Sequence, residues 1–189
     1  MKNPILFIHG FGGGKYEYQP VIRFLKKHSN PVCYEFVYKD KFGQSSMKLI
    51  AEDLHKYIVK NIPEQELDII GFSQGGIIAR YYISHYSDKK INKCITLCTP
   101  HSGSLMAYVG FFPGIKELQP NSLLLKDLDT GKAEYYAVYN PLDLFVFPGW
   151  HAKFKFAKEN KRVFALLHQL TFWNKRTLNF ISSVLEKTN

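Results

Sequence analysis

A glycine-flanked serine stands at position 73, within Gly71-Phe72-Ser73-Gln74-Gly75. It follows an apolar run typical of a buried strand, and it precedes a stretch with the composition of a helix. A side chain on so tight a strand-to-helix turn needs a strained backbone, and the residues two before and two after it must be small to avoid a clash. The five residues alone also fit an ordinary turn. Their position between a strand and a helix favours a serine whose hydroxyl projects from a sheet edge, beside the first amide of the helix.

Strand-like and helix-like segments alternate along the rest of the chain, which is typical of a parallel sheet covered by helices on both faces. The expected strands are Ile5 to Ile8, Val32 to Tyr38, Leu67 to Ile70, Cys94 to Cys98, Glu134 to Tyr139 and Arg162 to Leu167. Apolar residues at helical spacing lie between them around residues 18–25 and 47–57, and after the last of them around residues 178–185. The sequence therefore predicts a three-layer α/β/α fold with about six mostly parallel strands, forming a single domain over residues 1–189.

Residues 101–129 break this alternation. The segment is rich in Gly, Pro and large apolar residues, among them Leu105 and Met106. It follows a strand, so it should leave the carboxyl edge of the sheet, where ligands bind in open α/β folds. We expect a flap that lines an apolar pocket; the alternative is a pair of short packing helices.

A serine hydroxyl is a weak nucleophile until an oriented base removes its proton. Of the seven histidines, His168 is expected to end the last strand, at the same edge as Ser73. Asp143 follows the preceding strand, in a turn marked by Asn and Pro. The order Ser73, Asp143, His168 is one of the chain orders of the catalytic triad. His151 is the main rival for the base, and Asp127 and Asp129 lie inside the expected flap.

The negative charge that develops on an attacked carbonyl needs donors already in place. We expect one to be the main-chain amide of Gln74. The other is expected from Phe11, in the glycine-rich turn His9-Gly10-Phe11-Gly12-Gly13-Gly14 after the first strand. A phosphate-binding loop is the alternative, but Gly14-Lys15-Tyr16 lacks the required hydroxyl. His9 is expected to brace this loop.

Composition narrows the function further. The three cysteines have no metal-ligand spacing, so we expect free core thiols. The expected triad requires no metal and no organic cofactor. The net charge of +9 comes from scattered basic residues, which argues against nucleic-acid binding and leaves a mild attraction to anionic lipid interfaces. No apolar run approaches the roughly 20 residues that span a bilayer. The expected location is cytoplasmic, although a secreted chain trimmed of its leader would look the same.

Together these residues resemble the α/β-hydrolase superfamily, and within it the minimal bacterial triacylglycerol lipases and esterases. The matching stretches span most of the chain in the family's order: His9-Gly10-Phe11-Gly12-Gly13, Gly71-Phe72-Ser73-Gln74-Gly75-Gly76, Cys98-Thr99-Pro100-His101-Ser102-Gly103-Ser104, Asp143 with Val146, and His168-Gln169-Leu170. The resemblance implies an acyl-enzyme mechanism and an acyl pocket bordered by Phe72 and by the residues from Thr99 to Gly103, including His101. Phe72 and Gln74 stand where the lipases commonly have His and Met or Leu.

These observations predict a carboxylesterase or lipase that acts on small-molecule or lipid esters. Ser73 would be the nucleophile, His168 the base and Asp143 the acid, with the oxyanion held by the amides of Phe11 and Gln74. Phe72, His101, Leu105 and Met106 would line the substrate site. Two alternatives stay open: an acyl thioesterase or amidase with the same triad, and a non-catalytic lipid or small-molecule receptor on this fold.

Overall fold

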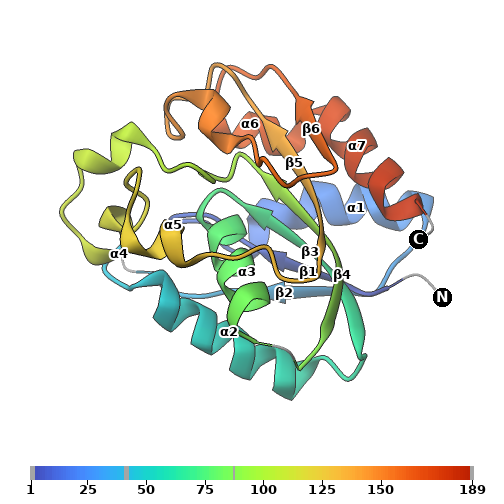
Figure 1. Ribbon diagram of the computed structural model, residues 1–189. Helices are drawn as coiled ribbons and strands as arrows, with labels where there is room; N and C mark the ends of the chain where they lie inside the picture. The colour runs from blue at the N-terminus through green and yellow to red at the C-terminus, as the bar shows by residue number, and fades with distance from the viewer. Residues whose placement is uncertain (1–2, 41–42, 87, 188–189) are drawn as a thin grey trace.

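A six-stranded sheet forms the centre of the computed structural model, which describes residues 3–40, 43–86 and 88–187. Its strand order is β2-β1-β3-β4-β5-β6, and every neighbouring pair is parallel (Figure 1). The strands are β1 (Ile5–Ile8), β2 (Cys33–Phe36), β3 (Glu66–Phe72), β4 (Lys90–Leu97), β5 (Glu134–Tyr139) and β6 (Glu159–Arg162). Because all of them run the same way, the loops after β1, β3, β4, β5 and β6 meet at one edge of the sheet.

Helices cover both faces of this sheet, as the alternating sequence predicts. On one face lie α2 (Met47–Asn61) and α3 (Gln74–His85), and on the other lie α1 (Gln19–His28), α6 (His168–Trp173) and α7 (Lys175–Glu186) (Figure 1). Two separate clusters of buried side chains result. The α/β/α arrangement is therefore confirmed.

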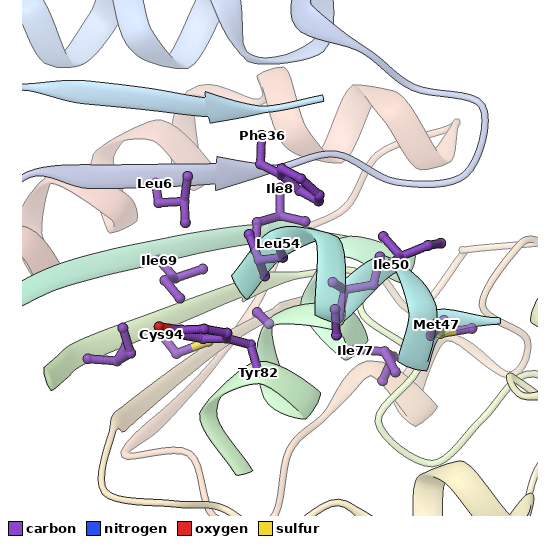
Figure 2. Close-up of a cluster of buried hydrophobic side chains, with 14 of the residues drawn as sticks. Leu6, Ile8, Phe36, Met47, Ile50, Leu54, Ile69, Ile77, Tyr82 and Cys94 are labelled. Carbon is purple, nitrogen blue, oxygen red and sulfur yellow. The ribbon is translucent and has the colours of Figure 1, made fainter. Parts of the chain in front are cut away.

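The larger cluster joins β1, β3 and β4 to α2 and α3. Figure 2 shows Leu6 and Ile8 of β1 gathered with Leu54 of α2, while Tyr82 of α3 and Cys94 of β4 lie in the same cluster. Each of these side chains is fully shielded from solvent. Fully burying an aliphatic side chain is worth about 1.5–3 kcal/mol, so this packing fixes α3, and with it the residue that precedes α3, against the sheet.

The last strand differs from the prediction. It was expected over Arg162 to Leu167, but β6 spans Glu159–Arg162, and residues 163–167 continue as a loop. Within this loop Val163 is buried and donates its N–H to the Tyr139 carbonyl, whereas Leu166 and Leu167 are largely exposed. As an edge strand, β6 alternates half-buried and exposed polar residues, which protects a free edge from pairing with other chains. The prediction was wrong because it assumed that an apolar run is a buried strand.

The segment over residues 101–129 consists of short elements: the 3₁₀ turn η2 (Leu105–Tyr108), α4 (Pro113–Lys116) and α5 (Leu123–Asp127). Glu117, just after α4, accepts hydrogen bonds from the Ser46 hydroxyl and the Met47 N–H at the start of α2. The Ser104 hydroxyl donates to the Phe145 carbonyl and accepts the N–H of Phe147. The segment is thus tied to α2 on one side and to the loop after β5 on the other.

No helix in the described part of the chain is long and apolar enough to cross a membrane.

Two further short turns complete the elements of the described residues. They are η1 (Lys15–Tyr18), which leads into α1, and η3 (Gly149–Ala152), between β5 and β6.

Candidate active site

Ser73 occupies a strained turn between β3 and α3. Its backbone has φ 52° and ψ −122°, a region that residues with a side chain rarely adopt. Two features hold it there: the Ser73 N–H donates to the Leu97 carbonyl at 2.7 Å, and glycines stand on both sides. A methyl carbon at Gly71 would lie 2.6 Å from the Cα of Gly76, and one at Gly75 would lie 2.5 Å from the His9 carbonyl oxygen. The glycines that the sequence identified are therefore required by close backbone approaches.

The glycine-rich loop after β1 lies directly against this serine. A methyl carbon at Gly10 would meet the Cβ of Ser73 at 3.0 Å and the Phe72 carbonyl oxygen at 3.2 Å. A hydrogen bond of 3.1 Å from the Gly13 N–H to the Gly10 carbonyl closes a tight turn, and Gly12 within it has φ +64°. Phe11 therefore lies in a turn that borders Ser73.

His9 supports the loop from within the protein. The Tyr38 N–H donates to His9 Nε2 at 3.1 Å, so Nδ1 carries the hydrogen and donates to the Gly10 carbonyl at 2.7 Å. Burial lowers the pKa of His9, although these main-chain hydrogen bonds oppose the effect. A neutral, buried imidazole with both nitrogens engaged acts as a brace.

Asp143 and His168 form a buried acid–base pair. Asp143 lies in the turn after β5, and His168 begins α6 after the loop that follows β6. Asp143 Oδ2 lies 2.6 Å from His168 Nδ1, and their side chains are 0 % and 5 % exposed. The other carboxylate oxygen, Oδ1, accepts the N–H groups of Phe145 at 2.9 Å and Val146 at 3.0 Å. Because the carboxylate holds Nδ1, the nitrogen left for proton transfer is Nε2.

The rival histidine lies elsewhere. His151 is part of η3, where its Nδ1 lies 2.9 Å from the Gly103 carbonyl and its own carbonyl accepts the Ser102 N–H. These contacts fix the loop after β4. His151 makes no ion pair with Asp143 among the contacts of the described residues.

Aromatic rings enclose the His168 imidazole. The Phe72 ring centroid lies 4.7 Å from it and the Phe145 centroid 5.4 Å. Phe72 is itself buried against Phe172 of α6 at 5.2 Å. The ring of Phe72, the residue before the nucleophile, thus packs directly beside the histidine.

The remaining residues expected at the substrate site fall into two groups. Leu105 and Met106 on η2 are about half exposed. His101 points into the protein instead: Nδ1 accepts from Arg80 at 3.3 Å, and Nε2 donates to the Thr96 hydroxyl at 2.9 Å. Complete burial and the neighbouring Arg80 charge hold the pKa of His101 well below its usual value. This histidine therefore anchors the loop after β4.

Comparisons with known proteins agree with this architecture. A model of the palmitoyl protein thioesterase family matches residues 4–139, which is more than two-thirds of the chain and includes Ser73. The chain belongs to this family. The matched region ends before Asp143 and His168, so the family match by itself does not cover the acid–base pair.

Individual relatives extend the comparison. The chain is 25% identical over 131 residues to human monoacylglycerol lipase ABHD6, a match that covers 66% of this chain and 38% of the relative. The chain thus spans less than two-fifths of the length of that relative. Aspergillus fumigatus lipase B has a similar fold, with a TM-score of 0.81 at 13% identity over 100% of this chain and 53% of that one. Bacillus licheniformis lipase BlEst2 in its mature form gives a TM-score of 0.74 at 15% identity, covering 97% and 92%. The fold is that of the α/β-hydrolases.

Three further residues lie next to the site. The sequence did not single them out as site residues. Glu17 of η1 accepts the Gly10 N–H at 3.1 Å, and burial raises the pKa of its carboxyl, although His168 opposes this. Asp40 accepts the Gln74 side-chain amide at 3.1 Å, and burial raises its pKa as well. Cys98 lies beside Asp143 and His168. The contacts of Asp40 and Cys98 join residues at least 34 positions apart, and that of Glu17 spans a seven-residue loop, so no sequence pattern considered above identifies them.

One group of side chains has the donor types that hold metal ions. Ligand atoms of Cys98, Asp143 and His168 lie within 4.8 Å of one another. Two of these atoms, Asp143 Oδ2 and His168 Nδ1, already form the 2.6 Å hydrogen bond. A metal ion there would have to displace that contact, so the donor set fits an acid–base pair better than a metal centre.

Proposed function

We propose that this chain is a serine hydrolase that cleaves carboxylic esters, with Ser73 as nucleophile, His168 as base and Asp143 as acid. The observation that carries the proposal is the buried 2.6 Å Asp143–His168 hydrogen bond at the sheet edge where strained Ser73 lies. Buried acid–histidine pairs orient the base and stabilise the imidazolium that forms when it takes a proton. Strain of this kind persists at functional sites because the surrounding structure enforces it.

In the proposed reaction, Nε2 of His168 takes the hydroxyl proton as Ser73 Oγ attacks the ester carbonyl. The same nitrogen then returns the proton to the leaving alcohol, and an acyl-enzyme remains. Water, deprotonated by His168, attacks the acyl carbonyl, releases the carboxylic acid and restores Ser73. Asp143 accepts the Nδ1 hydrogen throughout.

Main-chain amides of Phe11 and Gln74 are proposed to bind the oxyanion. Gln74 is the first residue of α3, and N–H groups in a first helical turn have no partner within the helix. The turn that contains Phe11 abuts Ser73 through Gly10. Removing one such donor typically costs about 2.7–4 kcal/mol of transition-state stabilisation.

The surroundings of the site support an apolar acyl substrate. Large hydrophobic side chains are exposed on the loops that follow β1, β4, β5 and β6, all at the edge where Ser73 lies. They include Phe11, Met106, Phe111, Leu144, Phe145 and Leu166. Exposed apolar groups concentrated around a site indicate a binding surface for an apolar partner. With the net charge of +9, this edge suits a lipid ester presented at an anionic interface.

An acyl thioesterase is the second candidate, and the family match specifically favours it. The proposed triad attacks oxygen esters and thioesters by the same steps, because both form the same acyl-enzyme. The two differ only in the leaving group that Nε2 protonates. Comparison of matched oxygen esters and thioesters is therefore required to separate them.

Labelling with a serine-directed fluorophosphonate tests the proposal without knowledge of the natural substrate. We expect one adduct per chain, located on Ser73 by peptide mass spectrometry, and no adduct in Ser73→Ala. Folded wild-type protein that does not react would refute the hydrolase and leave a non-catalytic receptor. The substrate class is then measured as kcat/KM over p-nitrophenyl esters of rising acyl length and over acyl thioesters of the same lengths, with and without anionic vesicles.

A further inference from the structure

Cys98 has a backbone conformation that a cysteine rarely adopts. It follows the last residue of β4, its φ is +47°, and it is completely buried. The left-handed region strongly favours glycine, because a Cβ crowds the neighbouring carbonyl there. A strained residue persists only where other interactions compensate for the strain. We therefore expect the side chain of Cys98 to make the interactions that compensate for this strain.

The Cys98 sulfur faces the proposed acid–base pair. Its sulfur, a carboxylate oxygen of Asp143 and a ring nitrogen of His168 lie within 4.8 Å of one another, and all three residues are buried. The Thr171 hydroxyl of α6 also lies near the sulfur, and it has no hydrogen-bond partner among the described residues. The thiol thus lies between the loop that carries Asp143 and the helix that begins with His168.

The thiol faces this carboxylate in its protonated form. Burial and the negative charge of Asp143 raise the pKa of the Cys98 thiol well above its usual range, and contacts with Thr171 and the Asn140 main chain oppose the shift only partly. An ionised carboxylate only accepts hydrogen bonds, whereas a protonated thiol donates. A hydrogen bond between these two groups would therefore run from the S–H to the carboxylate.

We propose that Cys98 is a positioning residue, whose S–H donates a hydrogen bond to the Asp143 carboxylate and holds it in plane with His168 Nδ1. This inference rests on the proposed function. The carboxylate already accepts His168 Nδ1 and the N–H groups of Phe145 and Val146. Of these, the two main-chain donors belong to its own turn. Cys98 adds a donor from the residue directly after β4, the strand that neighbours β5, and so fixes the carboxylate relative to the sheet.

Three substitutions at position 98 separate positioning from packing. Cys98→Ala and Cys98→Gly remove the donor, while Cys98→Ser keeps one. Glycine also relieves the strain at φ +47°, so Cys98→Gly should unfold at the same or higher denaturant concentration than Cys98→Ala. We expect kcat to fall roughly tenfold in Cys98→Ala and in Cys98→Gly, as for a lost hydrogen bond to a charged group, with KM unchanged. The kcat of Cys98→Ser should stay within about threefold of the wild-type value. Cys94→Ala is the matched control, because Cys94 on β4 is equally buried but packs in the opposite core cluster from Cys98.

A double-mutant cycle with Asp143→Asn tests the pathway of the effect. If Cys98 acts through Asp143, then Cys98→Ala should cost nothing further in the Asp143→Asn background. An equal loss of kcat in the wild-type and Asp143→Asn backgrounds would overturn the proposal in favour of simple packing. Wild-type activity in Cys98→Ala would also overturn it, as would a loss of kcat in Cys98→Ser as large as that in Cys98→Ala. The rate of fluorophosphonate labelling is measured in parallel. A wild type that does not label refutes the hydrolase itself, whereas a wild type that labels no faster than Cys98→Ala refutes only the role of Cys98.

Discussion

Replacement of Gly75 by alanine perturbs the proposed active site without touching any side chain in it. The added methyl carbon would lie 2.5 Å from the His9 carbonyl oxygen and closer still to the Ile8 carbonyl oxygen, whereas Cβ contacts below 3.0 Å essentially do not occur. To relieve both contacts, the start of α3 and the end of β1 must separate by about 1 Å. Both obstacles are main-chain carbonyl oxygens, one on the last residue of β1 and one on the residue after it, so no side chain can rotate to make room.

Two consequences follow from this displacement. Overpacking against a rigid backbone costs about 1–3 kcal/mol of unfolding free energy. The same shift moves Ser73 and the Gln74 amide away from the loop that contains Phe11, and a misplacement near 1 Å lowers turnover about 100-fold. The shift required here is about that size, so we expect kcat to fall roughly 100-fold, well beyond what the lost stability explains in protein that is still folded.

The measurement combines urea unfolding with hydrolysis of a p-nitrophenyl ester at a temperature where both proteins are folded. Gly14→Ala is the control for stability: a methyl group there meets nothing within 4 Å, and the backbone is extended at φ 179°. This control should match wild type or gain about 0.4–1 kcal/mol from the restricted unfolded chain. Wild-type stability and turnover in Gly75→Ala would refute the close approach of α3 to β1 and the geometric argument built on it.

Two predictions concern the pH dependence of stability. His101 stays neutral in the folded protein but takes up a proton near pH 6.5 in the unfolded chain. The free energy of unfolding of the wild type should therefore fall by up to about 1.4 kcal/mol per pH unit below pH 6.5, relative to His101→Gln, as measured by urea unfolding from pH 7.5 to 5. Equal pH slopes for the two proteins would show that His101 is charged in the fold. Asp40 behaves in the opposite sense, because its raised pKa favours the protonated form in the fold. Asp40→Asn should therefore gain stability relative to wild type as the pH rises above 3.8, and a constant difference between the two proteins would contradict the raised pKa.

The three residues of the proposed triad differ in whether local or long-range structure positions them. Ser73 depends on a local turn, since Gly71 and Gly75 lie within two residues of it. Asp143 and His168 are 25 residues apart and meet only because β5 and β6 pair in parallel and deliver their loops to one edge. The order of strands predicts this meeting, even though the last strand ends earlier than expected.

The length of the loop before His168 shows the limit of that reasoning. Residues 163–167 are as apolar as a buried strand, yet Leu166 is 83% exposed. Composition cannot distinguish an apolar segment that packs in a core from one that borders a substrate site. The difference is set by which neighbours the sheet provides, and β5 pairs with the polar residues Glu159–Arg162 instead.

The sequence by itself determined the parallel α/β arrangement, the strained serine turn and the glycine loop beside it, and it singled out Asp143 and His168, which the fold brings into contact. These features are readable because hydrophobic period, glycine spacing and strand order are properties of short segments. Only the tertiary structure decided that His101 points inward, that Glu17 and Asp40 hold the loops next to Ser73, and that Cys98 faces Asp143. Those contacts join residues between 7 and 45 positions apart, and which side chains meet across such distances depends on packing of the whole sheet. The serine turn thus suggests the proposed chemistry from sequence, whereas the buried groups packed around it become visible only in the fold.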